Sequence, residues 1–133
     1  ILFKENLRNL LNFHKSRKSS ISIYVHNRKY SNSIVEYSKK NGMIKSFYER
    51  PSKIKEAELI KKSDLNNFGV NSSIYIINSD ILKDLSKNDF LDFPKDIFPQ
   101  LIKMNKMFAL KTRKKRIAID SIKQLNQARR NFT

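Results

Sequence analysis

Several kinds of residue and pattern are missing from this 133-residue sequence. Cysteine is absent, which excludes disulfides, thiolate metal sites and cysteine nucleophiles. The glycines, Gly42 and Gly69, are isolated, so neither a Walker A loop nor a GxGxxG turn is present. No apolar run approaches the roughly 18–20 residues that span a bilayer, so we expect no transmembrane helix. The N-terminal segment has charges inside its apolar run and no small-residue cleavage site, so we expect no signal peptide and take a cytoplasmic location as the default.

Clusters of catalytic or metal-binding side chains are also missing. The histidines, His14 and His26, do not belong to any His/Asp/Glu cluster with zinc-ligand spacing. No Ser-His-Asp arrangement can be identified from the order of residues alone. We therefore expect both histidines to be packing or surface residues. If the protein is an enzyme, its chemistry is electrostatic or depends partly on residues outside this chain.

Acidic residues are scarce. The 12 Asp and Glu face 28 Lys and Arg, which gives a formal charge of +16. Such a charge usually indicates nucleic-acid binding, but the positive residues are spread along the chain and the richness in Lys, Ile and Asn is typical of AT-biased coding. The densest run, residues 111–116, is interpreted as a solvated hairpin turn. A phosphate-bearing small molecule would suit this field as well as nucleic acid.

The length and composition predict one folded domain. Hydrophobic residues make up 39% and charged residues 30%, and 133 residues are too few for two full domains. Apolar residues at helical spacing predict helices over residues 4–16 and 121–132, and a third helix over residues 92–104 with a kink at Pro99. Ser79 is expected to cap a short helix.

Segments rich in β-branched and aromatic residues predict the strands 21–25, 33–37, 43–48, 73–78, 107–112 and 116–120. Asn41-Gly42 predicts a tight turn between the second and third of these, because it supplies positive φ values. Residues 51–67 are left open as a loop, a short helix or an edge strand. The order of elements indicates a mixed α/β sheet covered by helices.

Four motifs together resemble the sugar nucleotidyltransferases, also called NDP-sugar pyrophosphorylases. Glu49-Arg50-Pro51 is similar to the Glu-Lys-Pro of that family, and residues 70–78 are similar to its NAGIY strand. Residues 93–102 resemble the helix that follows, and residues 117–120 resemble a strand that ends in a metal-binding Asp. The resemblance covers nearly the whole chain.

The resemblance implies a Rossmann-like nucleotide-diphospho-sugar transferase fold with a mixed, mostly parallel sheet. It also implies that residues 1–133 are the C-terminal part of a single nucleotidyltransferase domain, whose N-terminal part would hold the Gly-rich nucleotide-binding loop. The chain begins with Ile1 and not with Met, which agrees with this expectation.

The implied reaction transfers a nucleotidyl group from a nucleoside triphosphate to a sugar 1-phosphate and releases pyrophosphate, with Mg²⁺ as cofactor. The isolated chain is not expected to turn over. By the resemblance, Glu49 and Asn71 would hydrogen-bond the sugar, Arg50 would contact phosphate or sugar, and Asp120 would bind Mg²⁺. The base, the sugar and the oligomeric state stay open.

Each of these residues also has an ordinary interpretation. Glu49 and Arg50 could be solvated charges at a strand end, Asn71 a turn residue, and Asp120 an N-cap or an acid in the first turn of a helix. For the whole chain, the alternative function is a small basic nucleic-acid-binding module without catalysis. That alternative depends on the charge and on three tyrosines that we expect to be exposed, Tyr24, Tyr30 and Tyr48.

Overall fold

The computed structural model describes residues 1–27, 33–62, 67–84, 91–114 and 116–132. Their elements, in chain order, are β1 (Leu2–Phe3), α1 (Leu7–Ser16), β2 (Ile21–His26), β3 (Ser33–Tyr37), β4 (Ile44–Glu49), α2 (Lys53–Lys62), β5 (Phe68–Ile77), α3 (Ser79–Asp84), the π-helix η1 (Phe93–Ile97), α4 (Phe98–Lys103), β6 (Met107–Lys111), β7 (Arg116–Ile117) and α5 (Ile122–Asn131).

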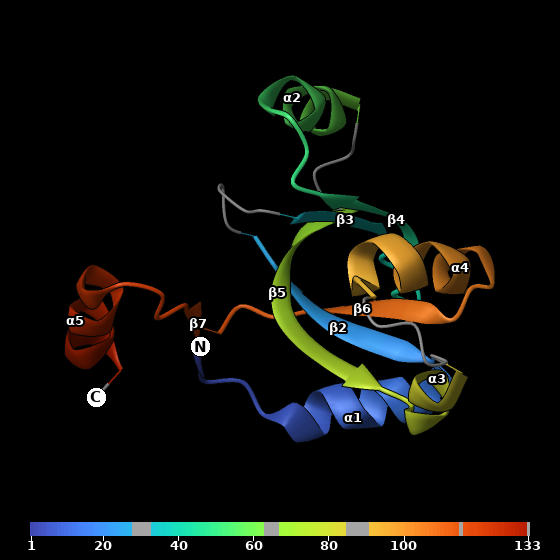
Figure 1. The fold of residues 1–133 in the computed structure, drawn as a ribbon, viewed down its shortest axis with the longest axis horizontal. Coiled ribbons are helices and arrows are strands. Elements are labelled where there is room, and N and C mark those ends of the chain that lie inside the picture. The colour runs from blue at the N-terminus through green and yellow to red at the C-terminus, as the bar shows by residue number, and fades with distance from the viewer. Residues whose placement is uncertain (28–32, 63–66, 85–90, 115, 133) are drawn as a thin grey trace.

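A five-stranded sheet with the order β4-β3-β5-β2-β6 forms the centre of the molecule (Figure 1). The β2–β6 pair is parallel, and the β2–β5, β3–β5 and β3–β4 pairs are antiparallel. The prediction of a mixed α/β fold is therefore confirmed. The finer prediction of a mostly parallel sheet is wrong for the described residues, because the β3–β4 hairpin and β5 each run antiparallel to their neighbours.

Helices pack on both faces of this sheet (Figure 1). One face of β2 carries Ile21, Ile23 and Val25, which belong to the main core together with Phe98 of α4. The other face of β2 packs against α1, where the Tyr24 hydroxyl donates to the backbone carbonyl of Asn6 at 3.1 Å. Because both faces are covered, all residues of β2 are buried.

The β3–β4 hairpin closes at residues 39–42. Gly42 has a φ of +83°, and the Asn41 side chain accepts a hydrogen bond from the Met43 amide. The predicted Asn-Gly turn is thus present, with the positive φ at the glycine. The Gly42 carbonyl accepts from the Ala109 amide at 2.7 Å, so the hairpin tip contacts β6 and the sheet curls toward its far edge.

The predicted helix over residues 92–104 is present in two parts. Residues 93–97 form a π-helical turn, and α4 begins at Phe98. Pro99 lies in the first turn of α4, and its missing N–H cannot donate to the carbonyl four residues earlier. This explains why the kink expected at Pro99 takes the form of a π-turn.

Two other segments differ in detail from the prediction. Residues 53–62 form helix α2, which begins after Ser52, whose hydroxyl accepts from the Lys55 amide. The predicted strand 116–120 is limited to Arg116–Ile117, because its partner β1 is equally short. The predicted helix over residues 121–132 is present as α5, with Ser121 as its N-cap. None of the helices in the described residues combines the length and apolar character that a bilayer crossing needs.

The sheet end at which β2 begins is held by a polar network, which we name the braced end. His14 on α1 is buried, with Nδ1 2.9 Å from the Ser22 hydroxyl and Nε2 2.8 Å from Asn78 Oδ1. Asn78 Nδ2 donates to the Ser19 carbonyl. An amide oxygen can only accept, so Nε2 donates and Nδ1 accepts from Ser22. The expectation that His14 is a packing residue is confirmed.

Candidate functional site

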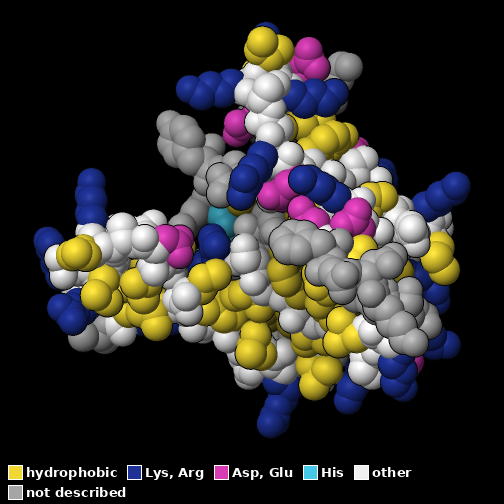
Figure 2. All heavy atoms as spheres, in the orientation of Figure 1, with side chains coloured by type: hydrophobic (Ala, Val, Ile, Leu, Met, Phe, Trp, Pro, Cys, Tyr) yellow, Lys and Arg dark blue, Asp and Glu magenta, His cyan; other side chains and the backbone are white. Residues whose placement is uncertain are grey.

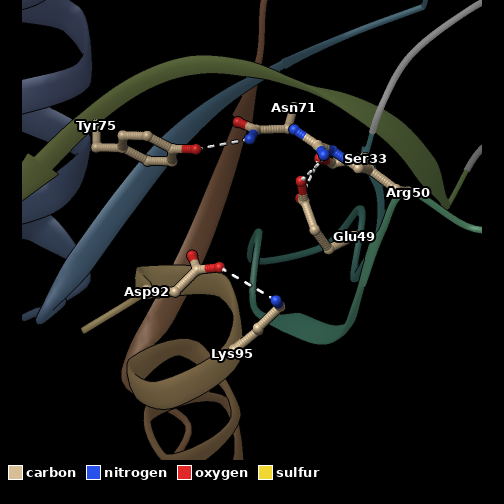
Figure 3. A network of polar contacts seen from close by, with 7 residues as sticks. All are labelled: Ser33, Glu49, Arg50, Asn71, Tyr75, Asp92 and Lys95. Carbon is tan, nitrogen blue, oxygen red and sulfur yellow. Dashed lines mark hydrogen bonds and ion pairs between the residues drawn. The ribbon is translucent and has the colours of Figure 1, made fainter. Parts of the chain in front are cut away.

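Polar residues meet at the opposite end of the sheet, which we name the open end. Strand register places Ser33 opposite Glu49 and Asn71 opposite Val25, one residue before His26. Four neighbouring strands, β2 to β5, therefore bring together, at one end of the sheet, side chains from segments that are far apart in the sequence. Glu49 and Asn71, two of the predicted site residues, lie in this group (Figure 3).

Glu49 is held from two sides. Its carboxylate accepts a short hydrogen bond from the Ser33 hydroxyl at 2.5 Å and forms an ion pair with Arg50 Nε at 3.6 Å. The Glu49 side chain is 30% exposed, whereas that of Arg50 is 79% exposed. The carboxylate is thus oriented by a buried partner and can still reach a ligand.

Arg50 has an unusual backbone. A proline usually keeps the residue before it extended. Arg50 departs from this preference, since its φ is +44°. The left-handed conformation turns the chain out of β4 and lets the guanidinium fold back on Glu49 (Figure 3). A non-glycine residue pays roughly 1–3 kcal/mol for such a backbone, and this kind of strain is often found at functional sites.

Asn71 lies where β5 is bulged. The register between β2 and β5 shifts between Ile23 and Val25, and Ser73 on the bulge has a φ of +61°. The Asn71 Oδ1 accepts from the Ser73 amide at 2.9 Å, which stabilises this turn. Its Nδ2 donates to the Tyr75 hydroxyl at 2.6 Å (Figure 3). Asn71 is therefore both a turn residue and part of the polar network.

The other positive φ values at non-glycine residues have a different cause. Lys18 and Asn105 each follow a helix, and their amides donate back to the last turn of α1 and α4 respectively. These are ordinary helix C-terminal motifs. Within the described residues, the positive φ values of Arg50 and Ser73 lie instead in the two segments that resemble family motifs.

Tyr75 was not singled out by the sequence analysis. Burial raises the pKa of its hydroxyl, the hydrogen bond from Asn71 lowers that pKa, the Glu49 charge raises it, and the Arg116 charge lowers it. The hydroxyl accepts from Asn71, so its own proton is the group that it can offer to a ligand. The one signal in the sequence that could have indicated it is its place in residues 70–78, the segment similar to the NAGIY strand.

A groove of about 430 Å³ adjoins Tyr75. Phe93, Pro94 and Phe98 supply apolar walls, and Asp92 supplies a carboxylate that pairs with Lys95 at 3.8 Å (Figure 3). An apolar groove with a few fixed polar groups is typical of small-molecule sites, which commonly measure about 300–1,000 Å³. The π-turn at its wall is a local feature that often accompanies such sites.

A second cavity, of about 290 Å³, lies on the other side of β5. Its lining includes Arg113, Lys114 and Arg116, with Ser72 and His26. We interpreted the run 111–116 as a solvated turn, and Arg113 and Lys114 are indeed exposed. The sequence did not indicate that this turn borders a cavity, since the opposite wall comes from β2 and β5.

Asp120 is outside the Glu49–Asn71 network. It lies beside the N-cap of α5, and its backbone N–H donates to the Gln124 side chain at 2.8 Å. The side chain is exposed. In the described residues, no group of three or more His, Cys, Asp or Glu side chains could hold a metal. Because Mg²⁺ often uses only one or two carboxylates with water and substrate phosphates, an exposed single carboxylate is compatible with it.

The features that suggested nucleic-acid binding are weaker in the structure. Tyr24 is only 1% exposed and Tyr48 is half-buried, so the expectation of exposed aromatics is wrong for Tyr24; Tyr30 lies outside the described residues. Acidic side chains gather on the face that Figure 2 shows, near the middle of the view. Glu49 at the open end and Asp92 in the groove beside Tyr75 would repel a nucleic-acid backbone.

Known proteins can now be compared with this arrangement. The family model described as nucleotidyl transferase matches residues 1–116. The chain belongs to this family. No curated protein sequence matches it. Among solved structures, one similar to this nucleotidyl transferase chain comes from Bacillus anthracis and is described as a glucose-1-phosphate thymidylyltransferase in complex with sucrose, with a TM-score of 0.65 and 14% identity.

That likeness covers 96% of this chain and 49% of the Bacillus anthracis chain. The nucleotidyl transferase chain thus spans about half the length of the solved structure. At this identity the likeness shows the fold alone, and it agrees with the mixed sheet described above. The recognition of a sugar nucleotidyltransferase family member from its motifs is confirmed.

Proposed function

We propose that this protein acts in the transfer of a nucleotidyl group from a nucleoside triphosphate to a sugar 1-phosphate, and that residues 1–133 bind the sugar phosphate as the C-terminal part of the catalytic domain. The observation that carries the proposal is the network at the open end. Tyr75 lines an apolar groove and its hydroxyl accepts from the Asn71 amide, and the Glu49 carboxylate, held by Ser33, lies at the same end of the sheet. Hydroxyl-rich rings need such fixed donors and acceptors next to apolar walls.

The roles in this proposal follow from the contacts. Glu49, oriented by Ser33, accepts hydrogen bonds from sugar hydroxyls, and the Tyr75 proton donates to a sugar oxygen. Arg50 neutralises charge on a phosphate oxygen after leaving its exposed ion pair. Asp120 would hold Mg²⁺ with one carboxylate oxygen, and the ion would neutralise charge that develops on the phosphates.

The experiment is a titration of the chain with glucose 1-phosphate, followed by amide and side-chain NMR shifts of Asn71 and Tyr75. We expect saturable shifts at both residues. Glu49→Gln keeps the side-chain shape but removes the charge, and should weaken binding by about tenfold. Asn126→Ala, at an exposed amide on α5, is the control and should bind as the wild type does.

Two results would contradict the proposal. One is the absence of shifts at Asn71 and Tyr75 at saturating glucose 1-phosphate. The other is unchanged affinity in Glu49→Gln, since the carboxylate is the central acceptor of the proposed site.

A further inference from the structure

The cavity on the far side of β5 lies where the parallel strands β2 and β6 both end. Its wall includes His26, which ends β2, and Thr112, which follows β6, while Ser72 of the β5 bulge forms part of the buried surface. In open α/β sheets, ligands bind beyond the carboxyl ends of parallel strands. Figure 2 shows a histidine close to basic side chains, between the part of the molecule that carries α5 and the body of the sheet.

Hydrogen bonds hold the backbone at Thr112 and Lys114, where the chain leaves β6. The Thr112 hydroxyl donates to Glu5 at 2.7 Å and accepts from the Lys114 amide at 3.1 Å, and the Thr112 amide donates to the Val25 carbonyl at 2.8 Å. These contacts use the backbone of the turn, so the long side chains of Arg113 and Lys114 stay available to a ligand. The turn therefore presents its charges at the cavity from a preorganised backbone.

The charge balance at this cavity is positive. Arg113, Lys114 and Arg116 line it, and the acid that contacts the turn is Glu5, whose pKa is lowered mainly by the Thr112 hydrogen bond and least by the Lys114 charge. Among the described residues, three cations line the cavity, and Glu5, the carboxylate that contacts the turn, already accepts a hydrogen bond from Thr112. Guanidinium and ammonium groups converging on a partly enclosed space select a compact anion, above all a phosphate group.

The remaining lining adds a donor and limits the size of the ligand. The Ser72 hydroxyl accepts from the Ile74 amide at 3.3 Å, so its proton is the group it can offer. A volume of about 290 Å³ is at the lower end of small-molecule sites, which suits one charged group better than a whole nucleotide sugar.

The cavity and the sugar-phosphate network are neighbours. The pKa of the Tyr75 hydroxyl is raised by the charge of Glu49, at the open end, and lowered by the charge of Arg116, in the cavity lining. A ligand with a neutral part against Asn71 and Tyr75 could therefore extend an anionic part toward the cavity. This adjacency favours a phosphate that belongs to the same ligand.

We propose that the cavity lined by Arg113, Lys114 and Arg116 binds a phosphate group. The group comes either from the sugar 1-phosphate, in which case the inference rests on the proposed function, or from free inorganic phosphate. Arg113 and Lys114 supply the charge, and the Ser72 hydroxyl donates to one phosphate oxygen.

The test is a titration of the chain with inorganic phosphate at constant ionic strength, followed by the amide shifts of Ser72, Thr112 and Lys114, with chloride as the reference anion. We expect saturable shifts. The double variant Arg113→Gln/Lys114→Gln should lose at least about tenfold in affinity, since each cation makes a charge-assisted contact. Lys103→Gln/Lys111→Gln removes the same charge from exposed positions outside the lining and should bind as the wild type does.

Non-saturating shifts, or equal losses in the two double variants, would overturn the proposal, because a general electrostatic field would then explain the binding. Whether the shifts saturate is decided by the wild-type titration, even if a variant fails to fold. Glucose 1-phosphate then separates the two sources. If it displaces inorganic phosphate competitively, the cavity holds the phosphate of the sugar ligand; if both bind together, the cavity takes free phosphate.

The two proposals can fail separately. Shifts at Asn71 and Tyr75 with glucose 1-phosphate, but none at the cavity with either compound, would overturn the phosphate site and leave the proposed function standing. Phosphate binding at the cavity without any response of Asn71 to glucose 1-phosphate would do the opposite.

Discussion

The braced end and the open end of the sheet use similar residues in different ways. At the braced end, the polar atoms of His14, Ser22 and Asn78 bind one another and tie α1 to the sheet. At the open end, Asn71 binds Tyr75 and Glu49 binds Ser33 and Arg50, and Tyr75 also lines a groove. The difference indicates that the first network mainly contributes stability and the second mainly offers groups to a ligand.

The largest effect on stability is expected from His14→Leu. The change removes both ring contacts and leaves the fully buried Ser22 hydroxyl without its acceptor. We expect a loss of about 1–3 kcal/mol in the free energy of unfolding, measured by urea denaturation. Glucose 1-phosphate binding by the folded variant should be unchanged. A loss of ligand affinity with little change in stability would contradict the contrast between the two ends.

Tyr75→Phe tests the open end with a change of one atom. The Asn71 amide loses its acceptor but lies in a half-buried position that water can reach, so the cost in stability should stay below about 1 kcal/mol. The affinity for glucose 1-phosphate should fall several-fold, because the hydroxyl proton is a proposed donor. Calorimetric titration and urea denaturation of the same sample separate the two quantities. A variant that is strongly destabilised but binds normally would make Tyr75 a structural residue.

The sequence predicted the elements of both ends better than their contacts. Periodicity and Asn41-Gly42 were sufficient for α1, β2 and the hairpin, since these signals are local. The cavity depends on β6 pairing with β2, a parallel contact that no local signal specifies. The φ of Arg50 was missed for a related reason: its ion pair with Glu49 and the path of the chain out of β4 override the preference set by Pro51.

The sequence motifs also separated residues that the structure treats differently. Glu49 and Asn71 were predicted one by one and both lie at the open end, because β4 and β5 pair with opposite sides of β3. Asp120 was predicted from a motif in the same way, but it lies beside the α5 N-cap and does not contact Glu49 or Asn71. Tyr75 was missed because a tyrosine in an apolar strand resembles an ordinary core residue.

A smaller effect on the free energy of unfolding is expected when the pH is lowered and Glu5, at the open end, becomes protonated. The folded-state pKa of Glu5 is below its ordinary value of 4.5, mainly because of the Thr112 hydrogen bond. A lowered pKa stabilises the fold above that value, and the contribution is lost as pH falls through the folded-state pKa. Because the pair is partly exposed and screened, we expect less than about 1 kcal/mol.

Urea denaturation between about pH 5 and about pH 3 measures this contribution in the wild type and in Thr112→Val. The variant keeps the side-chain shape and lacks the hydroxyl that lowers the pKa most. Its stability should therefore depend less on pH in this interval. Parallel curves for the two proteins would show that Glu5 does not hold the cavity turn.

The smallest expected effect on stability concerns the backbone of Arg50, and it is tested by the sign of a difference between two variants. Its side chain is 79% exposed and its ion pair contributes little, so Arg50→Ala should change stability by less than about 0.5 kcal/mol. At a φ of +44°, however, glycine is favoured over alanine. We therefore expect Arg50→Gly to be more stable than Arg50→Ala by roughly 0.5–1 kcal/mol.

Lys45, an exposed residue inside β4, provides the matched comparison. There glycine should be less stable than alanine by roughly 0.5–1 kcal/mol, because it weakens a strand of ordinary conformation. Opposite signs at Lys45 and Arg50, measured by urea denaturation, would locate real backbone strain at the open end. If alanine is more stable than glycine at both positions, Arg50 is an unstrained residue at a strand end. The contrast between the braced end and the open end would then depend on Glu49, Asn71 and Tyr75 alone. Arg50 directly follows Glu49, whose carboxylate is a proposed ligand-binding group. Backbone strain at such a position is expected where the placement of the carboxylate matters more than stability.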